Sequence, residues 1–377
     1  MLEIVTTEQP NLEHLSGIHA LRGIAALMVL LFHLHHIGRI PLPESVKMIA
    51  SHGGLGVMLF FVLSSFSLLY SNRAITQEIN SAWLVTYFVK RFFRIAPLFY
   101  TMLGVYCFLI VFVFDGHIKL SSLFLNILFL FNFFPHEAEG LVWASWSIGV
   151  EMIFYALLPL IIMMTRQSRL VLPYWLIAVL VSVIFRISLE SSPGIPPGYP
   201  HYAFLSELGV FWGGILAYQL LCKFRSSVAE TQVKLLFFSI VVGIALTLFL
   251  LAPGAAVLGR DGRVDVQLWG LAFGLLAFLV TVRPKAWMAR PIMRHFGERS
   301  YSIYLLHAGF IYACGPTLRY INSFLIPLIG NYGFFVCAAL VLLPILIASD
   351  VTYRLIETKG IDLGARILKW YARPGAQ

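Results

Sequence analysis

The amino-acid sequence predicts an all-α fold, a polytopic membrane bundle of about ten transmembrane helices with one short re-entrant or interfacial helix. Two observations predict it: 59% of the 377 residues are hydrophobic, and only 12% are charged. An ordinary soluble domain is about 45–50% apolar and about 25% charged. So few charges cannot cover the water-facing surface of a protein of this length, which excludes the soluble and disordered classes.

Apolar runs recur along nearly the whole chain, and ten of them are long enough to cross a membrane, for which a helix needs about 20 mainly apolar residues. An eleventh run, at 121–135, is shorter and ends in FNFFPHEAEG. The ten predicted spans are 17–38, 53–72, 95–114, 143–165, 170–187, 203–222, 235–252, 264–282, 300–318 and 331–350.

The basic residues orient these spans, because loops rich in Lys and Arg face the cytoplasm. If 121–135 does not cross the membrane, the basic clusters all fall on the side of the N-terminus. We therefore predict that both termini are cytoplasmic and that 187–202 and 253–263 face outward. The same loops account for the formal net charge of +9, so no nucleic-acid partner is predicted. The basic clusters lie within 73–94, 166–169, 223–234, 283–299 and 354–373.

The chain is predicted to form one membrane domain at 17–350, between a cytoplasmic segment at 1–16 and a cytoplasmic tail at 351–377. The start, MLEIVTTEQP, lacks the basic residues of a cleavable signal peptide, so the first span is expected to remain as a signal-anchor. The four cysteines form no C-x-x-C pair, and neither a zinc site nor a disulfide framework is predicted.

The first span contains two ionisable residues, Arg22 and His33. Their spacing corresponds to three helical turns plus about 20° and a rise of roughly 16 Å, so the two side chains share one face. Ionisable residues inside a span face a cavity or a partner by default. The plainer interpretation is that Arg22 reaches the membrane surface and that His33 forms an interfacial cluster with His35 and His36. Neighbouring residues on a helix point apart, so no metal site is predicted there.

The fourth span carries Ser147, Glu151 and Tyr155 at intervals of four residues, again on one helical face. Glu151 is predicted at a depth comparable to that of His33, where a carboxylate and a histidine can form an acid/base or orienting pair. The alternative is a structural glutamate paired with an arginine. Ser64, in the second span, is interpreted as a helix-packing residue.

Two further segments carry polar residues. The ninth predicted span contains Tyr301 and His307, and this histidine is interpreted equally well as a packing residue or a functional one. The segment KRFFRIAPLFY places Lys90, Arg91 and Arg94 at the inner mouth of the third span. Such residues determine topology, and several converging cations also bind phosphate groups well.

Six sequence blocks in order resemble the acyltransferase-3 family of membrane-bound O-acyltransferases, which includes bacterial O-antigen and exopolysaccharide O-acetylases. The resemblance extends from about residue 16 to residue 358. Two positions depart from the family pattern, because Met58 stands where many members have an acidic residue and Ser65 replaces a glycine. The blocks are IHALRGIAALMVLLFH, GGLGVMLFFVLSSF, KRFFRIAPLFY, WSIGVEMIFYALLPL, SYSIYLLHAGF and YRLIET.

The resemblance implies an O-acyltransferase that transfers groups other than aminoacyl groups. It implies acyl-CoA, most simply acetyl-CoA, as the cytoplasmic donor, and no metal. The implied acceptor is an extracytoplasmic carbohydrate or glycolipid hydroxyl, so the enzyme would modify a polysaccharide at a bacterial plasma (inner) membrane, in contact with membrane lipid. It further implies that Arg22 and His33 are essential for activity.

These expectations combine into a predicted mechanism. Transfer from a thioester to an alcohol needs a general base, and we predict that His33 is that base, with Glu151 orienting it. Arg22 would contact the pantetheine arm or the carbonyl of the donor. Lys90, Arg91 and Arg94 would hold the CoA phosphates. The residues predicted to line the substrate channel are Ser147, Tyr155, Ser64, Tyr301 and His307.

Other interpretations remain open at this point. A covalent acyl-enzyme at Ser147 is disfavoured, because the residue one turn away is an acid rather than a histidine. A proton-linked secondary transporter could use Arg22, His33 and Glu151 as its substrate site. The sequence shows no two-half repeat and no matched pair of broken helices, which argues against a transporter. A non-catalytic export protein would not need a basic inner mouth aligned with a buried histidine.

Overall fold

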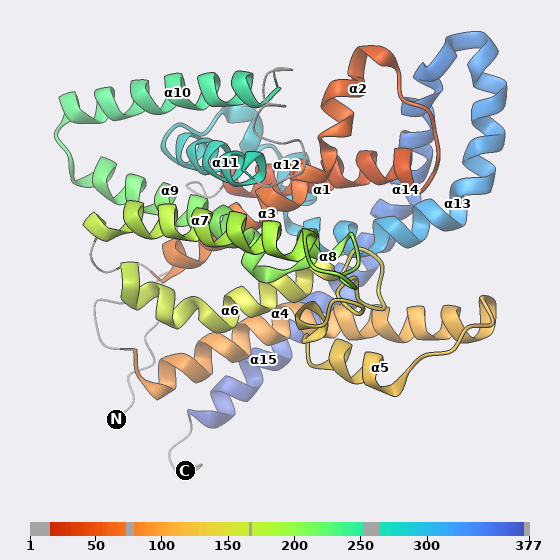
Figure 1. Cartoon of the computed structure of the whole chain (residues 1–377), viewed down its shortest axis with the longest axis horizontal. Coiled ribbons are helices and arrows are strands. Elements are labelled where there is room, and N and C mark those ends of the chain that lie inside the picture. The colour runs from red at the N-terminus through yellow and green to blue at the C-terminus, as the bar shows by residue number, and fades with distance from the viewer. Residues whose placement is uncertain (1–15, 73–78, 166–167, 252–263, 373–377) are drawn as a thin grey trace.

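The computed structural model describes residues 16–72, 79–165, 168–251 and 264–372, and the regular structure in these ranges consists of helices without a strand. The long helices pack side by side in a bundle (Figure 1). The all-α polytopic fold predicted from composition is therefore confirmed. The predicted outer loop 253–263 and nearly all of the segment 1–16 lie outside the described residues.

Within the described residues, nine helical stretches are long and apolar enough to cross a membrane. The last stretch, 300–371, contains two long helices joined by a short turn, so each of the ten predicted spans falls on a long helix. These are α1 (Ser16–His36), α3 (Gly56–Ser71), α4 (Ser81–Phe108), α6 (Trp146–Thr165), α7 (Val171–Glu190), α9 (Leu208–Ser226), α10 (Ala229–Leu251), α11 (Asp265–Val282), α13 (Ser300–Ile329) and α14 (Gly333–Thr352).

Shorter helices occupy the predicted loops and the tail. The C-terminal one continues α14 through a π-helical turn at Tyr353–Glu357, so the predicted cytoplasmic tail is largely helical. The short helices are α2 (Glu44–Ser51), α5 (Leu120–Ile127), α8 (Tyr199–Tyr202), α12 (Pro291–Glu298) and α15 (Thr358–Tyr371).

The start of α4 differs most from its predicted boundary. The helix begins at Ser81 rather than at 95, because the side chain of Asn80 accepts a hydrogen bond from the backbone N–H of Trp83 at 2.9 Å and caps it. The first half of α4 therefore carries Lys90, Arg91 and Arg94 on regular helical backbone.

The segment 121–135 does not form a crossing helix. Its helix α5 has eight residues, and a rise of about 12 Å is far less than a hydrocarbon core of about 30 Å. The chain then turns back, and the Asn132 Nδ2 donates to the carbonyl oxygens of Trp146 at 3.0 Å and Tyr202 at 2.9 Å. Irregular backbone at membrane depth is tolerated where protein groups satisfy it, so the segment is re-entrant or interfacial, as predicted.

The helices α9 and α11 pack closely on each other, and α1 and α3 pack against them. A Cβ added at Gly213 would lie 2.4 Å from the carbonyl oxygen of Gly270, and one added at Gly274 would lie 2.5 Å from that of Gly213. Small residues let membrane helices approach this closely. The core so formed supports α1, which carries the first residues of the candidate site.

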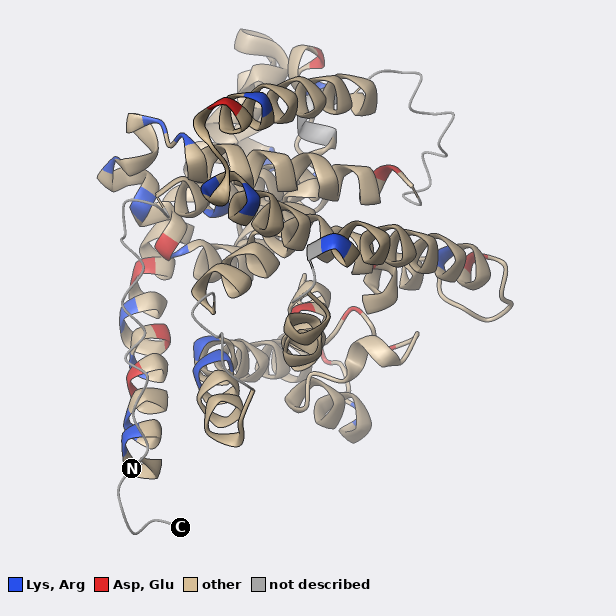
Figure 2. Ribbon diagram, turned by 90° about the vertical axis from the view of Figure 1, so that its left-hand side faces the viewer, with Lys and Arg blue, Asp and Glu red and all other residues tan. Residues whose placement is uncertain are grey.

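The end of the bundle at which α4 begins and α15 ends faces the viewer in Figure 2, and Lys and Arg lie on several of its ribbons. This grouping is the one expected if basic loops share one side of a membrane.

Candidate active site

His33 lies three residues before the end of α1, and its nearest ionisable contact comes from α13. The Nδ1 of His33 lies 3.0 Å from the Nε2 of His307, and the ring centroids are 4.9 Å apart. The same Nδ1 lies 3.0 Å from the carbonyl oxygen of Val29. His307 is 1% exposed, and its Nδ1 is hydrogen-bonded to the carbonyl oxygen of Tyr304. The structure therefore brings together two of the predicted site residues.

Tyr304 extends this contact to α6. Its hydroxyl donates to the carbonyl oxygen of Ala144 at 2.8 Å and lies 2.6 Å from the Oγ of Ser147. The rings of Tyr304 and His307 have centroids 5.5 Å apart. We call His33, His307, Tyr304 and Ser147 the histidine cluster; it joins α1, α6 and α13.

Glu151 lies one turn beyond Ser147 on α6. Its carboxylate accepts a hydrogen bond from the Oγ of Ser64 at 2.6 Å and another from the hydroxyl of Tyr155. Ser64 and Tyr155 are both buried, and Tyr87 in turn donates to the carbonyl oxygen of Tyr155 at 3.0 Å. Glu151 is thus held by neutral hydroxyl donors.

Arg22 of α1 and Arg91 of α4 lie near this part of α6, and Arg94 of α4 lies near Arg22. The guanidinium carbon of Arg91 lies 5.9 Å from the centroid of the Tyr155 ring. Arg22 is half-buried and interacts electrostatically with Tyr155 and Glu151, and also with Arg91 and Arg94. It forms no hydrogen bond or ion pair within the part of the chain that the structure describes. We call Arg22, Arg91, Arg94, Glu151 and Tyr155 the arginine cluster.

Arg94 is already paired with an acid that sequence reasoning missed. Its Nη1 lies 3.0 Å from the Oε2 of Glu357, whose side chain is fully buried. The other oxygen of Glu357 accepts from the hydroxyl of Ser302, which accepts from the hydroxyl of Thr352 at 3.0 Å. The available signal was an acidic residue in the YRLIET block, directly after a long apolar helix.

The other predicted residues stand apart from both clusters. Lys90 is exposed. The hydroxyl of Tyr301 donates to the carbonyl oxygen of Ile95 at 2.9 Å, so it serves the contact of α13 with α4. His35 and His36 each hydrogen-bond a nearby carbonyl oxygen at 2.9 Å.

The structure does not bring Glu151 into contact with His33. The hydrogen bonds of Glu151 go to Ser64 and Tyr155, and the side chain hydrogen-bonded to His33 is His307. Spacing along one helix fixes rotation and depth, but it does not say which helix lies next to which face.

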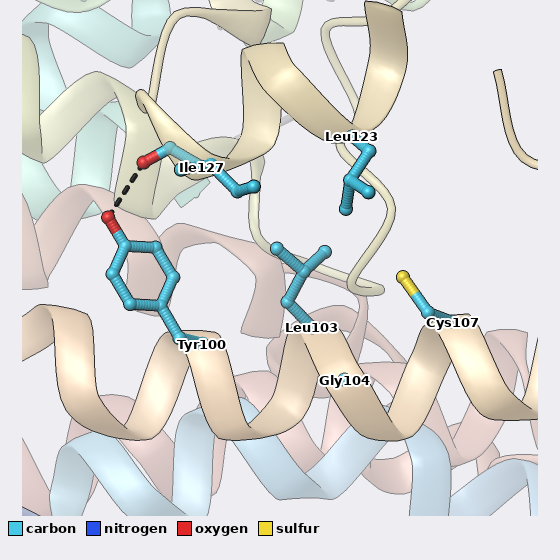
Figure 3. A pocket seen from close by; sticks show the side chains of 6 residues that line it. All are labelled: Tyr100, Leu103, Gly104, Cys107, Leu123 and Ile127. Carbon is cyan, nitrogen blue, oxygen red and sulfur yellow. Dashed lines mark hydrogen bonds between the residues drawn. The ribbon is translucent and has the colours of Figure 1, made fainter. Parts of the chain in front are cut away.

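Two cavities lie against α4. The larger, of about 660 Å³, opens between α4, the segment 128–133 and α6, with Arg91 and Tyr155 in its wall. The smaller, of about 360 Å³, lies between α4 and α5, and Tyr100 at its edge donates to the carbonyl oxygen of Ile127 at 2.7 Å (Figure 3). Of the two, only the larger reaches the arginine cluster. Among the described residues, no three His, Cys, Asp or Glu side chains are grouped to hold a metal ion.

Comparison with known proteins identifies the family to which the chain belongs. The family model of the acyltransferase-3 proteins, described as an acyltransferase domain, matches residues 15–352. The chain belongs to the acyltransferase-3 family. Both clusters lie on helices within the matched region, and Glu357 lies just beyond it.

Two curated relatives are similar over most of this chain. ORF330 of Acidianus two-tailed virus, named as a candidate acetyltransferase, is 28% identical over 307 residues, which are 80% of this chain and 84% of that protein. The peptidoglycan O-acetyltransferase OatA of Listeria monocytogenes serovar 1/2a is 25% identical over 338 residues, which are 83% of this chain and 52% of that protein. The chain therefore spans about half the length of OatA. No solved structure matches it.

The family and these relatives show that the protein is an O-acyltransferase, and its long apolar helices make it an integral membrane protein. The predicted enzyme class is thereby confirmed. The transporter that the ionisable residues also allowed is disfavoured, because neither the family nor the relatives point to transport.

Proposed function

We propose that this acyltransferase-3 protein moves an acetyl group from acetyl-CoA, bound on the cytoplasmic side, to a hydroxyl of an extracytoplasmic carbohydrate or glycolipid. The observation that carries the proposal is a line of polar side chains along α6. Tyr155, Glu151 and Ser147 follow one another at successive turns. Tyr155 and Glu151 are hydrogen-bonded to each other and to Ser64 of α3, and Ser147 is hydrogen-bonded to Tyr304 of α13. The line joins a cationic region to a pair of histidines.

His33 is the proposed general base. Its Nδ1 is engaged by the carbonyl oxygen of Val29 and by His307, which leaves Nε2 to approach a hydroxyl. In the proposed step, Nε2 removes the hydroxyl proton and the hydroxyl oxygen bonds to the thioester carbon. The carbon–sulfur bond breaks, and the proton passes to the CoA sulfur. The products are an ester and free CoA.

The arginine cluster is the proposed region for the polar part of the donor. Arg22 forms no hydrogen bond or ion pair within the described chain, so its N–H groups are available to the pantetheine arm or the thioester carbonyl. Arg91, with the exposed Lys90 beside it, is proposed to hold CoA phosphates. The charge of Arg94 is compensated by Glu357, so we propose that it anchors α4 rather than binds phosphate.

The distance between Arg22 and His33 along α1 supports separate roles for the arginine cluster, which would hold the donor, and for the base. Arg22 and His33 are separated by roughly 16 Å along α1, so a donor held by its polar end must reach the base through an extended arm. Ser64, Tyr155 and Ser147 are proposed to line that path. Glu151 is proposed to balance the charge of Arg22 there.

The acceptor proposal draws on a relative. The name of the Listeria protein says that it acetylates peptidoglycan, whose glycan strands are carbohydrate. This chain spans about half of that protein, so the carbohydrate acceptor remains a proposal about this enzyme. Comparing the cell-envelope glycans of cells with and without the protein by mass spectrometry would identify acceptor and acyl group together.

A sided assay tests donor and orientation together. In proteoliposomes, the four native cysteines are replaced and Arg290→Cys is introduced in the predicted cytoplasmic loop. Acetyl-CoA should support acyl transfer only from the face on which an impermeant thiol reagent labels position 290. Transfer only from the opposite face would overturn the orientation. No release of free CoA in any arrangement would overturn acetyl-CoA as the donor.

A further inference from the structure

His307 is a buried titratable side chain for which the sequence analysis predicted only a place in the channel wall. At 1% exposure it has almost no surface with which to contact a substrate. Both of its ring nitrogens are engaged within the protein, Nδ1 with the carbonyl oxygen of Tyr304 and Nε2 with the Nδ1 of His33. Because both nitrogens are engaged, His307 can influence the reaction only through its contact with His33.

The hydrogen bonds assign the ring protons. A carbonyl oxygen only accepts, so the Nδ1 of His307 carries a proton and the Nε2 of the neutral ring has a lone pair. The proton in the 3.0 Å contact between the rings therefore belongs to the Nδ1 of His33. That nitrogen also faces the carbonyl oxygen of Val29 at 3.0 Å, which again needs a donor. His33 is left with a lone pair on Nε2, the form that a general base requires.

The surroundings described by the structure offer no competing carboxylate partner. Among the described residues, no carboxylate hydrogen-bonds to either histidine, and Glu151 is bonded to Ser64 and Tyr155. The other titratable groups that act on the pair are His36 on α1 and Tyr304 on α13. Tyr304 is itself committed to the carbonyl oxygen of Ala144 and to Ser147.

We propose that His307 is a positioning residue that fixes the tautomer and the ring orientation of His33. The inference rests on the proposed function, because it assumes that His33 is the base. When His33 takes the acceptor proton, its Nδ1–H bond to His307 becomes a bond from a charged donor and strengthens. A neutral imidazole thus takes the place that a carboxylate has in the Ser-His-Asp triad, and it adds no second buried charge beside the base.

Two substitutions at His307 separate positioning from packing. In His307→Ala, the Nδ1 of His33 loses its side-chain acceptor and keeps only the carbonyl oxygen of Val29 on its own helix. The kcat should fall by about 10–100-fold, as is typical when the group that orients a working histidine is removed. The Michaelis constant for acetyl-CoA should change little, because the arginine cluster is untouched. In His307→Gln, the side-chain carbonyl can accept the same hydrogen bond, so part of the lost rate should return. The matched control is Cys314→Ala, a half-buried position two turns along α13, which should keep wild-type activity.

The pH dependence of kcat/KM supplies the readout that a packing defect would not move. In His307→Ala the limb that reports the base should shift, whereas a packing defect lowers the rate equally at all pH values. Nitrogen-15 spectra of histidine-labelled wild-type protein test the assignment without relying on a variant, and both rings should carry their proton on Nδ1. A wild-type rate and pH profile in His307→Ala, beside an inactive His33→Ala, would overturn the inference and leave the proposed function standing. Equal losses in the Ala and Gln variants with an unshifted profile would also overturn it. Near-wild-type turnover in His33→Ala would instead contradict the proposed function.

Discussion

The histidine cluster and the arginine cluster differ in how they carry charge. The hydrogen bonds of the histidine cluster end on the backbone carbonyl oxygens of Val29, Ala144 and Tyr304, and its members are formally neutral with the proton assignment above. The arginine cluster contains three cations, which the acids Glu151 and Glu357 compensate in part.

If the histidine cluster holds the base and the arginine cluster holds the donor, as proposed, this difference gives a reason for their separation along the bundle. A general base must be neutral before it takes a proton, so a surrounding of neutral carbonyl oxygens suits it. An anionic donor needs cations, and buried cations are costly unless acids balance them. One region cannot satisfy both requirements at the same place, and the polar side chains of α6 connect the two.

The largest expected effect is at His33. His33→Ala should lower acyl transfer by about 10²–10⁴-fold, the usual contribution of a general base. Acetyl-CoA binding should persist, because the arginine cluster is unchanged; transfer assays and calorimetric titration of the same purified protein measure both. His36→Ala is the matched control, since its exposed ring is hydrogen-bonded to the carbonyl oxygen of Phe32. Loss of binding together with transfer would mean that the two clusters are not functionally separate.

The second prediction concerns stability at the arginine cluster. Arg94→Ala leaves the fully buried Glu357 without its partner, and the free energy of unfolding should fall by about 3 kcal/mol. Adding Glu357→Gln should recover most of that loss, because no buried charge then remains. Denaturation of the detergent-solubilised variants measures the effect. Lys90→Ala, at an exposed neighbouring position, should change stability little. If Arg94→Ala were no less stable than Lys90→Ala, the pair would not anchor α4.

A smaller effect is expected at Arg91, on donor affinity rather than on turnover. Arg91→Ala should raise the apparent Michaelis constant for acetyl-CoA by about tenfold, the loss expected for one charge-assisted contact, with kcat nearly unchanged. Raising the ionic strength should weaken donor binding less in the variant than in the wild type. Lys223→Ala, an exposed cation at the end of α9, is the control. The same Michaelis constant in Arg91→Ala and wild type would leave Arg91 only a topological role.

The smallest effect is expected at Ser147. Its hydroxyl is bonded to Tyr304 and not to a histidine nitrogen, so Ser147→Ala should lower turnover by less than about tenfold. Steady-state rates measure this, and intact-protein mass spectrometry of samples quenched during turnover should show no acylated enzyme. An acyl adduct on Ser147, with a loss as large as that of His33→Ala, would restore the covalent mechanism.

The fold could be predicted to the extent that burial in lipid imposes long apolar runs. All ten runs became long helices, and the short run at 121–135 became the eight-residue α5. The errors lie where helices are not uniformly apolar. The first half of α4 carries three cations, and α15 is amphipathic, so neither gives an apolar run although both are helical.

The sequence allowed single residues of the candidate site to be predicted, but not the contacts between them. His33 and Arg22 could be found because ionisable side chains inside an apolar run are rare, and Glu151 for the same reason. Their partners could not, because Glu151 is hydrogen-bonded to Ser64 and Tyr155 whereas His33 is hydrogen-bonded to His307, and the sequence does not show which helix faces which. The pairing of His33 with His307 depends on the approach of α13 to α1, which helical spacing does not encode.

The partners of the histidine pair are 274 residues apart in the chain, and this separation bears on how the enzyme is made. Membrane helices enter the bilayer in the order of synthesis, so α1 is in place long before α13 leaves the ribosome. Ser147 likewise lacks its partner Tyr304 until α13 is made, and Arg94 lacks its partner Glu357 until the chain beyond α14 is made. The histidine cluster therefore cannot be completed until α13 has inserted, and the charge of Arg94 is not compensated until Glu357 has followed α14. If the clusters act as proposed, a nascent or prematurely terminated chain is a membrane protein without a working site, and it does not consume the acyl donor while it is being assembled.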